Sequence, residues 1–283
     1  ELAAQAAHIP VHLGSMAFAM RDIVDRIDWQ SGDMVVLNDP FLGGTHLPDV
    51  TLIAPLFIDG ERIAFVANRA HHADIGGESP GSMPISSCLE EEGLIIPPTL
   101  LQRRGILNET LMGAIAGVEA DERRGDFAAQ MSANRNGLQR LEGLIQSVGR
   151  AHFGALLQAL NDYAERLACG ALQAIPDGNY GFTDYLDDDG MGHTDLPIRL
   201  ALTVTQGAIR ADFSGTAAQT PGNVNAPLAV AAAALYYVLR CLMPPQTPAC
   251  AGAFRPITIH APPGSLLNAQ RPAAVAAGNV ETS

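Results

Sequence analysis

Two apolar segments joined by a short turn constrain the fold of this chain more than any other feature. Residues 51–58 and 62–67 have the composition of β-strands, and the Asp59-Gly60 pair between them favours a tight hairpin turn. In an antiparallel hairpin, residues that precede the first strand lie beside residues that follow the second. We therefore expect His46 and His71, which flank the two strands, to lie close together in space.

The rest of the chain combines short apolar segments with longer segments of helical spacing, which predicts an α+β fold. We expect mixed β-sheet layers and a helical layer over about residues 108–175. Besides the hairpin, the expected strands are residues 34–37, 180–186, 198–205, 208–213 and 257–260, and residues 94–98 are expected to be extended and buried. The expected helices are residues 16–27, 108–121, 125–148, 150–174 and 228–242, with breaks near Arg124-Gly125 and at Gly149.

This pattern divides the chain into three regions. We expect a β-rich region with the candidate site over residues 1–107, a helical region over 108–176, and a β-rich region with one buried helix over 177–283. The three are expected to form one domain that continues beyond both ends, because the chain has no initiator methionine and its last residues have the pattern of an ordered element.

Charge and composition argue against several classes of protein. The formal net charge is −13, which does not suit binding to nucleic-acid phosphates. The four cysteines form no CxxC pair, and the N-terminal residues show no signal-peptide pattern, so we expect a cytoplasmic protein with reduced thiols. The most apolar stretch, residues 226–243, is expected to be a buried helix, not a membrane span. No Walker A motif is present, so the chain offers ATP no standard binding site.

Histidine and aspartate side chains gather around the predicted hairpin, beside two Gly-Gly pairs. His46, His71 and His72 are three of the chain's eight histidines. His46, Asp49 and His71 together supply two imidazoles and one carboxylate, a donor set that suits Mn, Fe or Zn and leaves positions for water and substrate. The alternative is that these are hydrogen-bonded loop residues that cap strands.

The two adjacent histidines, His71 and His72, are expected to differ in role. On an extended chain their side chains point to opposite sides, so only one should bind the metal. We expect His72 to lie behind the metal ligands or to face the substrate. Asp74 is a candidate general base, or a hydrogen-bond partner of a histidine. His72 and Asp74 are therefore our candidate catalytic residues.

With these motifs, the sequence resembles the hydantoinase B/oxoprolinase family. This family includes the B-type subunits of ATP-dependent N-methylhydantoinases, the C-terminal half of 5-oxoprolinases, and large subunits of acetone and acetophenone carboxylases. The matching segments extend over essentially the whole chain and are residues 8–16, 38–49, 71–77, 96–98, 212–216, 221–227 and 278–283.

The resemblance implies a two-component enzyme, and hence a hetero-oligomer. A hydantoinase A-type subunit with an actin-like ATPase fold uses ATP to phosphorylate the substrate, and the B-type subunit completes the reaction. In the carboxylase branch, the B-type subunit carries manganese or a similar ion on a His-x-x-Asp pair and a later histidine. These positions match His46, Asp49 and His71, which implies a divalent metal (Mn, Zn or Fe) in this chain and ATP in the partner subunit.

The activity that the resemblance implies is ATP-dependent hydrolysis of a cyclic amide, such as hydantoin or 5-oxoproline ring opening. Neither nucleic acid nor a membrane is expected as a partner. Two alternatives stay open: an acetone or acetophenone carboxylase-type subunit, and a non-catalytic scaffold for the A-type ATPase. The motifs match the hydrolase and carboxylase branches equally, and we favour the hydrolase because it is the broader group.

Overall fold

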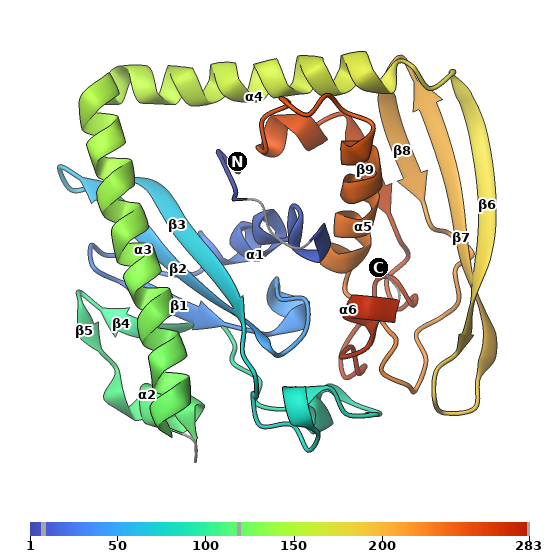
Figure 1. The fold of residues 1–283 in the computed structure, drawn as a ribbon, viewed down its shortest axis with the longest axis horizontal. Helices are drawn as coiled ribbons and strands as arrows, with labels where there is room; N and C mark the ends of the chain where they lie inside the picture. Colours follow the sequence, from blue (N-terminus) through green and yellow to red (C-terminus); the bar gives the residue numbers. More distant parts are fainter. Residues whose placement is uncertain (7–9, 118–119, 282–283) are drawn as a thin grey trace. The chain divides into compact units, whose positions relative to one another are not determined.

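The computed structural model describes residues 1–6, 10–117 and 120–281 (Figure 1). His8 of the N-terminal motif therefore lies outside the described residues, as do Thr282 and Ser283 of the last motif. The combination of two β-sheets with helices confirms the expected fold class.

Contacts between residues group the chain into two compact units. The first unit consists of residues 1–18, 85–89 and 151–283, and the second of residues 19–84 and 90–150. Each unit is assembled from segments that are distant in sequence. The three regions expected from the sequence are consecutive, and they remain a prediction about domains.

Among the described residues, the second unit contains a five-stranded antiparallel sheet in the order β3-β2-β1-β4-β5. Its strands are β1 (Met34–Leu37), β2 (Asp49–Ile58), β3 (Glu61–His71), β4 (Thr99–Arg103) and β5 (Ile106–Leu107). The predicted strand over residues 34–37 is confirmed. Val35 and Leu37 of β1 pack with Trp29 and with Ile23 of α1 (Ser15–Ile23), which gives this sheet its own small core.

Strands β2 and β3 form the predicted hairpin. Asp59 and Gly60 have φ angles of 51° and 79°, the left-handed pair that a type I′ turn requires and that glycine adopts without strain. Both strands extend further than predicted. Asp49 begins β2, His71 ends β3, and the two residues are cross-strand partners. His71 is therefore the last residue of the hairpin and does not follow it.

Residues 94–98 belong to no strand, and β4 begins only at Thr99. Ile96 is buried as expected, but Leu94 and Pro97 are exposed, so the segment as a whole is not buried. Pro97 and Pro98 have no N–H group to donate to a neighbouring strand, which explains why no strand forms before Thr99. Ile96 instead donates its N–H to the side chain of Asn38 at 2.7 Å.

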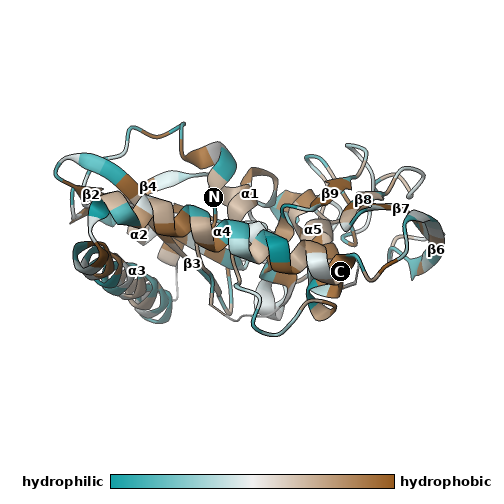
Figure 2. Ribbon diagram, turned by 90° about the horizontal axis from the view of Figure 1, so that it is seen from above, coloured by the Kyte–Doolittle hydropathy of each residue, from teal (hydrophilic) through white to brown (hydrophobic). Residues whose placement is uncertain are grey.

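Helix α2 (Glu109–Ala116) leads to the long helix α3 (Ala120–Val148), which packs across β2 and β3 (Figure 1). Figure 2 shows hydrophilic and hydrophobic residues alternating along α3, as expected of a helix with one face on a sheet. The predicted break near Arg124-Gly125 is wrong, because α3 continues through both residues. The helices separate instead at Gly117, whose φ is 63°.

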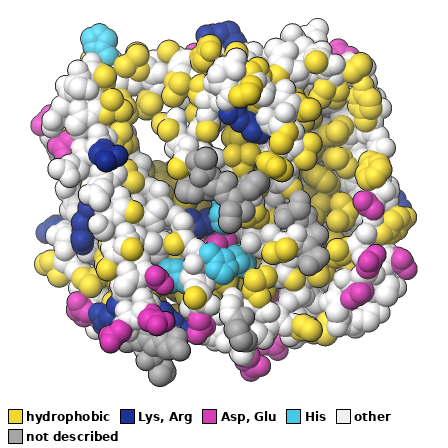
Figure 3. Space-filling view, viewed as in Figure 1, with side chains coloured by type: hydrophobic (Ala, Val, Ile, Leu, Met, Phe, Trp, Pro, Cys, Tyr) yellow, Lys and Arg dark blue, Asp and Glu magenta, His cyan; other side chains and the backbone are white. Residues whose placement is uncertain are grey.

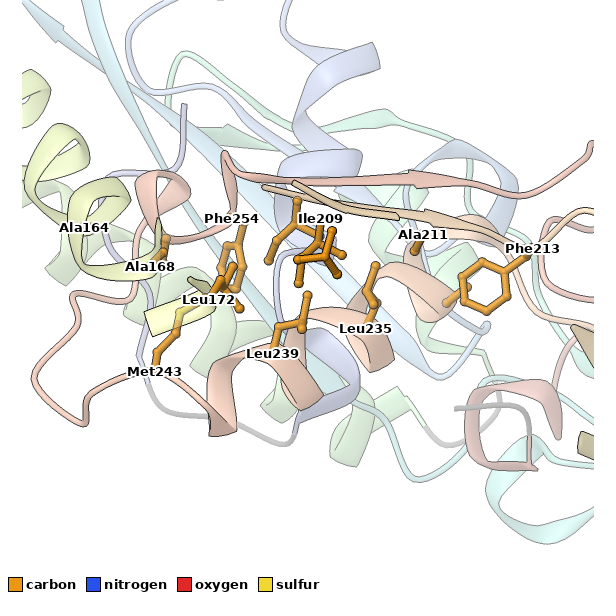
Figure 4. Close-up of a cluster of buried hydrophobic side chains, with 14 of the residues drawn as sticks. Ala164, Ala168, Leu172, Ile209, Ala211, Phe213, Leu235, Leu239, Met243 and Phe254 are labelled. Carbon is orange, nitrogen blue, oxygen red and sulfur yellow. The ribbon is translucent and has the colours of Figure 1, made fainter. Parts of the chain in front are cut away.

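In the described part of the first unit, a second sheet has the order β6-β7-β8-β9, and only β8 and β9 are parallel. Its strands are β6 (Gly178–Asp188), β7 (Thr194–Thr205), β8 (Ala208–Asp212) and β9 (Ile257–His260). Helices α4 (Arg150–Leu172) and α5 (Leu228–Cys241) agree with the predicted helices to within two residues, and a short helix, α6 (Gly278–Glu281), follows. Figure 4 shows Leu172 of α4 and Leu239 of α5 in one hydrophobic cluster with Ile209 of β8.

Helix α5 is the apolar helix expected from the sequence, and its alanines, such as Ala232 and Ala233, are fully buried. Within the ranges that the structure describes, no helix combines the length and the apolarity that crossing a membrane requires.

Candidate functional site

The loop that precedes β2 is shaped by two glycines and one buried asparagine. A Cβ atom on Gly43 would lie 2.2 Å from the Cα of Ala19, and one on Gly44 would lie 2.5 Å from the carbonyl oxygen of Asn38. Only glycine permits such close approach of the backbone. The side-chain amide of Asn38 donates to the carbonyl oxygen of Leu47 at 2.9 Å. These contacts hold the segment that carries His46 against the sheet.

His46, Asp49 and His71 come together at one end of the hairpin, as the sequence predicted. Nδ1 of His46 lies 2.7 Å from Oδ2 of Asp49, and both side chains are buried. The rings of His46 and His71 have centroids 5.1 Å apart. Thr45 donates a hydrogen bond from Oγ1 to Oδ2 of Asp49. Figure 3 shows histidine side chains gathered over the end of β3 and the loop before β2.

The chemistry of this donor set fits a divalent metal ion. Nδ1 of His46 is buried without a hydrogen bond, although a carboxylate oxygen lies beside it. Imidazole nitrogens and a carboxylate oxygen are the ligands that Zn, Mn and Fe share. The three side chains do not form a complete coordination group, however. Among the residues described, no three histidine, cysteine, aspartate or glutamate side chains are arranged to hold a metal ion.

Arg69 lies on the same face of β3 as His71, and sequence reasoning missed it. Its Nε donates to Oγ1 of Thr51 at 2.8 Å, and its Nη2 donates to the carbonyl oxygen of Gly43 at 2.9 Å. Burial lowers the pKa of the Arg69 guanidinium, and the charge of Asp49 opposes that shift. Arg69 therefore ties the histidine-bearing loop to the hairpin. The available signal was its spacing of two residues from His71 on a strand.

His72 turns away from His71 toward helix α3. Its Nε2 lies 3.0 Å from Oε1 of Gln130, and its ring centroid lies 4.8 Å from that of Phe127. The two adjacent histidines therefore face opposite sides, as expected for an extended chain. The buried position of His72 places it behind the three candidate metal ligands, His46, Asp49 and His71.

Asp74 organises the loop that follows β3. Its Oδ1 accepts hydrogen bonds from the N–H of Gly76 at 2.6 Å and from Ser82 Oγ at 3.0 Å, and its Oδ2 accepts one from Arg123 at 2.5 Å. The bond from Gly76 makes the largest contribution to lowering the pKa of Asp74, and burial acts in the opposite direction. A lowered pKa makes a carboxylate a weaker base, so the geometry favours a role in holding the loop over a role as general base.

The Asp74→Asn variant is expected to be less stable than the wild type at pH 7, because asparagine loses the ionic contact with Arg123. The folded-state pKa of Asp74 is lowered, so its contribution to stability is present above the unfolded pKa and is lost as pH falls through the folded pKa. Urea unfolding of the wild type and the variant measures this effect. The difference between their midpoint urea concentrations should shrink below about pH 4. A difference that stays constant between pH 7 and pH 3 would contradict this account.

The comparisons with known proteins agree with these motifs. The hydantoinase B/oxoprolinase family matches the chain over residues 1–283. The chain belongs to this family. It is 34% identical to 5-oxoprolinase 1 of Arabidopsis thaliana, a match that covers 100% of the chain and 24% of the relative. It is 33% identical to the putative B-type subunit of a D-/L-hydantoinase from Pseudomonas sp. (strain NS671), covering 95% of the chain and 48% of the relative.

Two solved structures share the fold of this family member. The ATP-dependent caprolactamase from Pseudomonas jessenii superposes with a TM-score of 0.89 at 29% identity, covering 98% of the chain and 49% of the caprolactamase chain. Acetone carboxylase in its nucleotide-free structure superposes with a TM-score of 0.85 at 19% identity, covering 98% and 39%. The second likeness is one of fold alone. The family member thus spans about half or less of the proteins it matches.

Proposed function

We propose that this chain is the B-type part of an ATP-dependent enzyme that hydrolyses a cyclic amide. The observation that supports this is the set of relatives that match almost all of the chain. A 5-oxoprolinase, a putative hydantoinase subunit and a caprolactamase are 29–34% identical to it, and all three names refer to cyclic amides. The acetone carboxylase is only 19% identical. The hydrolase is therefore favoured over the carboxylase.

The proposed cofactor is a divalent metal ion, Mn, Zn or Fe, held by His46, Asp49 and His71. When bound, such an ion polarises a carbonyl group and lowers the pKa of a coordinated water. The chain's own contribution is to place the ligands. The cross-strand pairing of Asp49 with His71 sets two of them, and the Gly43–Gly44 loop, held by Arg69, sets the third.

The proposed partner is a hydantoinase A-type ATPase subunit, which would phosphorylate the amide before this chain acts on it. An unstrained amide is a poor electrophile, and phosphorylation of its oxygen would make the carbonyl carbon more susceptible to attack by water, after which the ring C–N bond breaks. The sequence carries no Walker A motif, which supports placing the ATP-dependent step in the partner.

One observation favours a second candidate, a non-catalytic scaffold for the ATPase. Within the part of the chain that the structure describes, the three proposed ligands do not complete a metal-holding arrangement. A scaffold would need no metal, whereas the catalytic subunit would.

The function is tested by combining the full polypeptide with an A-type subunit and supplying hydantoin, 5-oxoproline, caprolactam, or acetone with bicarbonate, each with and without ATP. We expect the ring of at least one compound to open only when ATP and both proteins are present. ATP-dependent carboxylation of acetone, with no ring opening, would instead establish the carboxylase. A stable complex with no turnover of any of these substrates would support the scaffold.

A further inference from the structure

Behind the β2–β3 hairpin, three side-chain amides form a chain of hydrogen bonds that ends at His72. Asn134 on α3 donates to the carbonyl oxygen of Leu52 at 3.1 Å, and its Oδ1 accepts from Asn68 at 2.9 Å. Asn68 Oδ1 accepts from Gln130 Nε2 at 2.9 Å, and Gln130 Oε1 lies 3.0 Å from His72 Nε2. The chain of bonds therefore joins the helix to both strands of the hairpin.

The donor and the acceptor of every hydrogen bond in this network follow from contacts with backbone carbonyl oxygens, which can only accept. Gln130 Nε2 donates to the carbonyl oxygen of Val50 at 2.9 Å, and Asn68 Nδ2 donates to the carbonyl oxygen of Gln130 at 2.8 Å. Asn134 is oriented by Leu52 in the same way. The oxygen and nitrogen of each amide are thus identified by fixed partners. Gln130 Oε1 must accept, so His72 must carry a proton on Nε2.

The same contacts hold the end of β3 in place. The backbone N–H of His72 donates to the carbonyl oxygen of Pro48 at 2.8 Å, and its ring packs against Phe127. His72 is 1% exposed, and its Nδ1 is buried without a hydrogen bond. The residue is therefore held through its backbone on one side and its Nε2 on the other. Because His71 precedes it directly, a shift of His72 would move His71.

We propose that Gln130 is a positioning residue for the metal site: it holds His72 in the Nε2–H tautomer and so fixes the end of β3 that carries His71. This inference rests on the proposed function in one respect, that His71 is a metal ligand. Groups that orient the ligands of a metal from behind typically change its affinity about 10- to 100-fold. No sequence motif marks Gln130, which lies 58 residues beyond His72.

The experiment has one readout without metal and one with it. In the full polypeptide labelled with ¹⁵N-histidine, long-range ¹H–¹⁵N spectra report which ring nitrogen carries the proton, and a His72→Gln variant identifies the signals of His72. We expect an Nε2–H ring in the wild type and a loss of that preference in Gln130→Met. The Kd for Mn²⁺ or Zn²⁺ should rise about tenfold in Gln130→Met.

Gln146→Met is the matched control, because Gln146 lies on the same helix, is exposed, and bonds to Glu142 on its own helix. It should change neither the tautomer nor the Kd. A His72 ring protonated on Nδ1 in the wild type overturns the inference, even if Gln130→Met fails to fold. A Gln130→Met variant that folds and has an unchanged Kd for the metal also overturns it. A wild type that binds no metal but has the Nε2–H ring overturns the proposed metal site and leaves the role of Gln130 in fixing the tautomer supported.

Discussion

Replacing either His46 or His71 with alanine is expected to abolish stoichiometric metal binding. Each residue supplies one of only three proposed ligands. The two donors that remain in either variant would bind the metal too weakly to keep it from the buffer. Elemental analysis of the purified protein, after incubation with Mn²⁺, Zn²⁺ or Fe²⁺ and desalting, measures the effect. We expect about one ion per wild-type chain, consistent with a single site, and well below that in both variants.

The two replaced side chains differ in burial, so the variants separate loss of a ligand from loss of packing. His46 is 1% exposed and its replacement also disturbs packing, whereas His71 is exposed and its replacement does not. His152, an exposed histidine on α4, is the matched control, and His152→Ala should keep its metal. Absence of metal from the wild type after reconstitution, or retention of metal in His71→Ala, would contradict the proposed site and strengthen the scaffold alternative.

The Gly252→Ala substitution is expected to cause a large loss of stability in the first unit. Gly252 is buried, and its N–H donates to Oδ1 of Asn161 on α4 at 2.7 Å. A Cβ atom at this position would lie 2.0 Å from the carbonyl oxygen of Asn161, which is backbone and cannot move aside as a flexible side chain can. Overpacking of this kind lowers the free energy of unfolding by about 3 kcal/mol.

Urea unfolding at pH 7 measures this effect, with Gly170→Ala as the control. Gly170 lies on the same helix as Asn161, and an added Cβ there would meet nothing within 4 Å. Alanine should raise helix stability at that site by up to about 1 kcal/mol. Equal urea midpoints for Gly252→Ala and the wild type would show that the close contact with α4 relaxes without cost.

Features set by neighbouring residues could be predicted from the sequence. The left-handed Asp59-Gly60 turn and the strand over residues 34–37 depend on turn chemistry and on local apolar patterns, and both are confirmed. The approach of His46 to His71 followed from the hairpin alone, because antiparallel strands bring their outer ends together. The family was also recognisable, since its motifs are contiguous segments in a constant order.

Local patterns also caused the errors. Arg124-Gly125 resembles a helix boundary, yet α3 continues through it, because packing of the helix on β2 and β3 outweighs the small cost of one glycine. The apolar composition of residues 94–98 predicts a buried segment, but Leu94 and Pro97 are exposed.

The sequence by itself determined the hairpin, the fold class, the family and the three candidate ligands. Only the tertiary structure decided that His72 faces Gln130 on α3 and that Arg69 binds the loop at Gly43. It also decided that Asp74 accepts hydrogen bonds within the loop that follows β3. The physical reason is distance along the chain. A turn or a strand depends on residues next to one another, whereas these side-chain partners meet only after strand register and helix packing bring distant segments into contact.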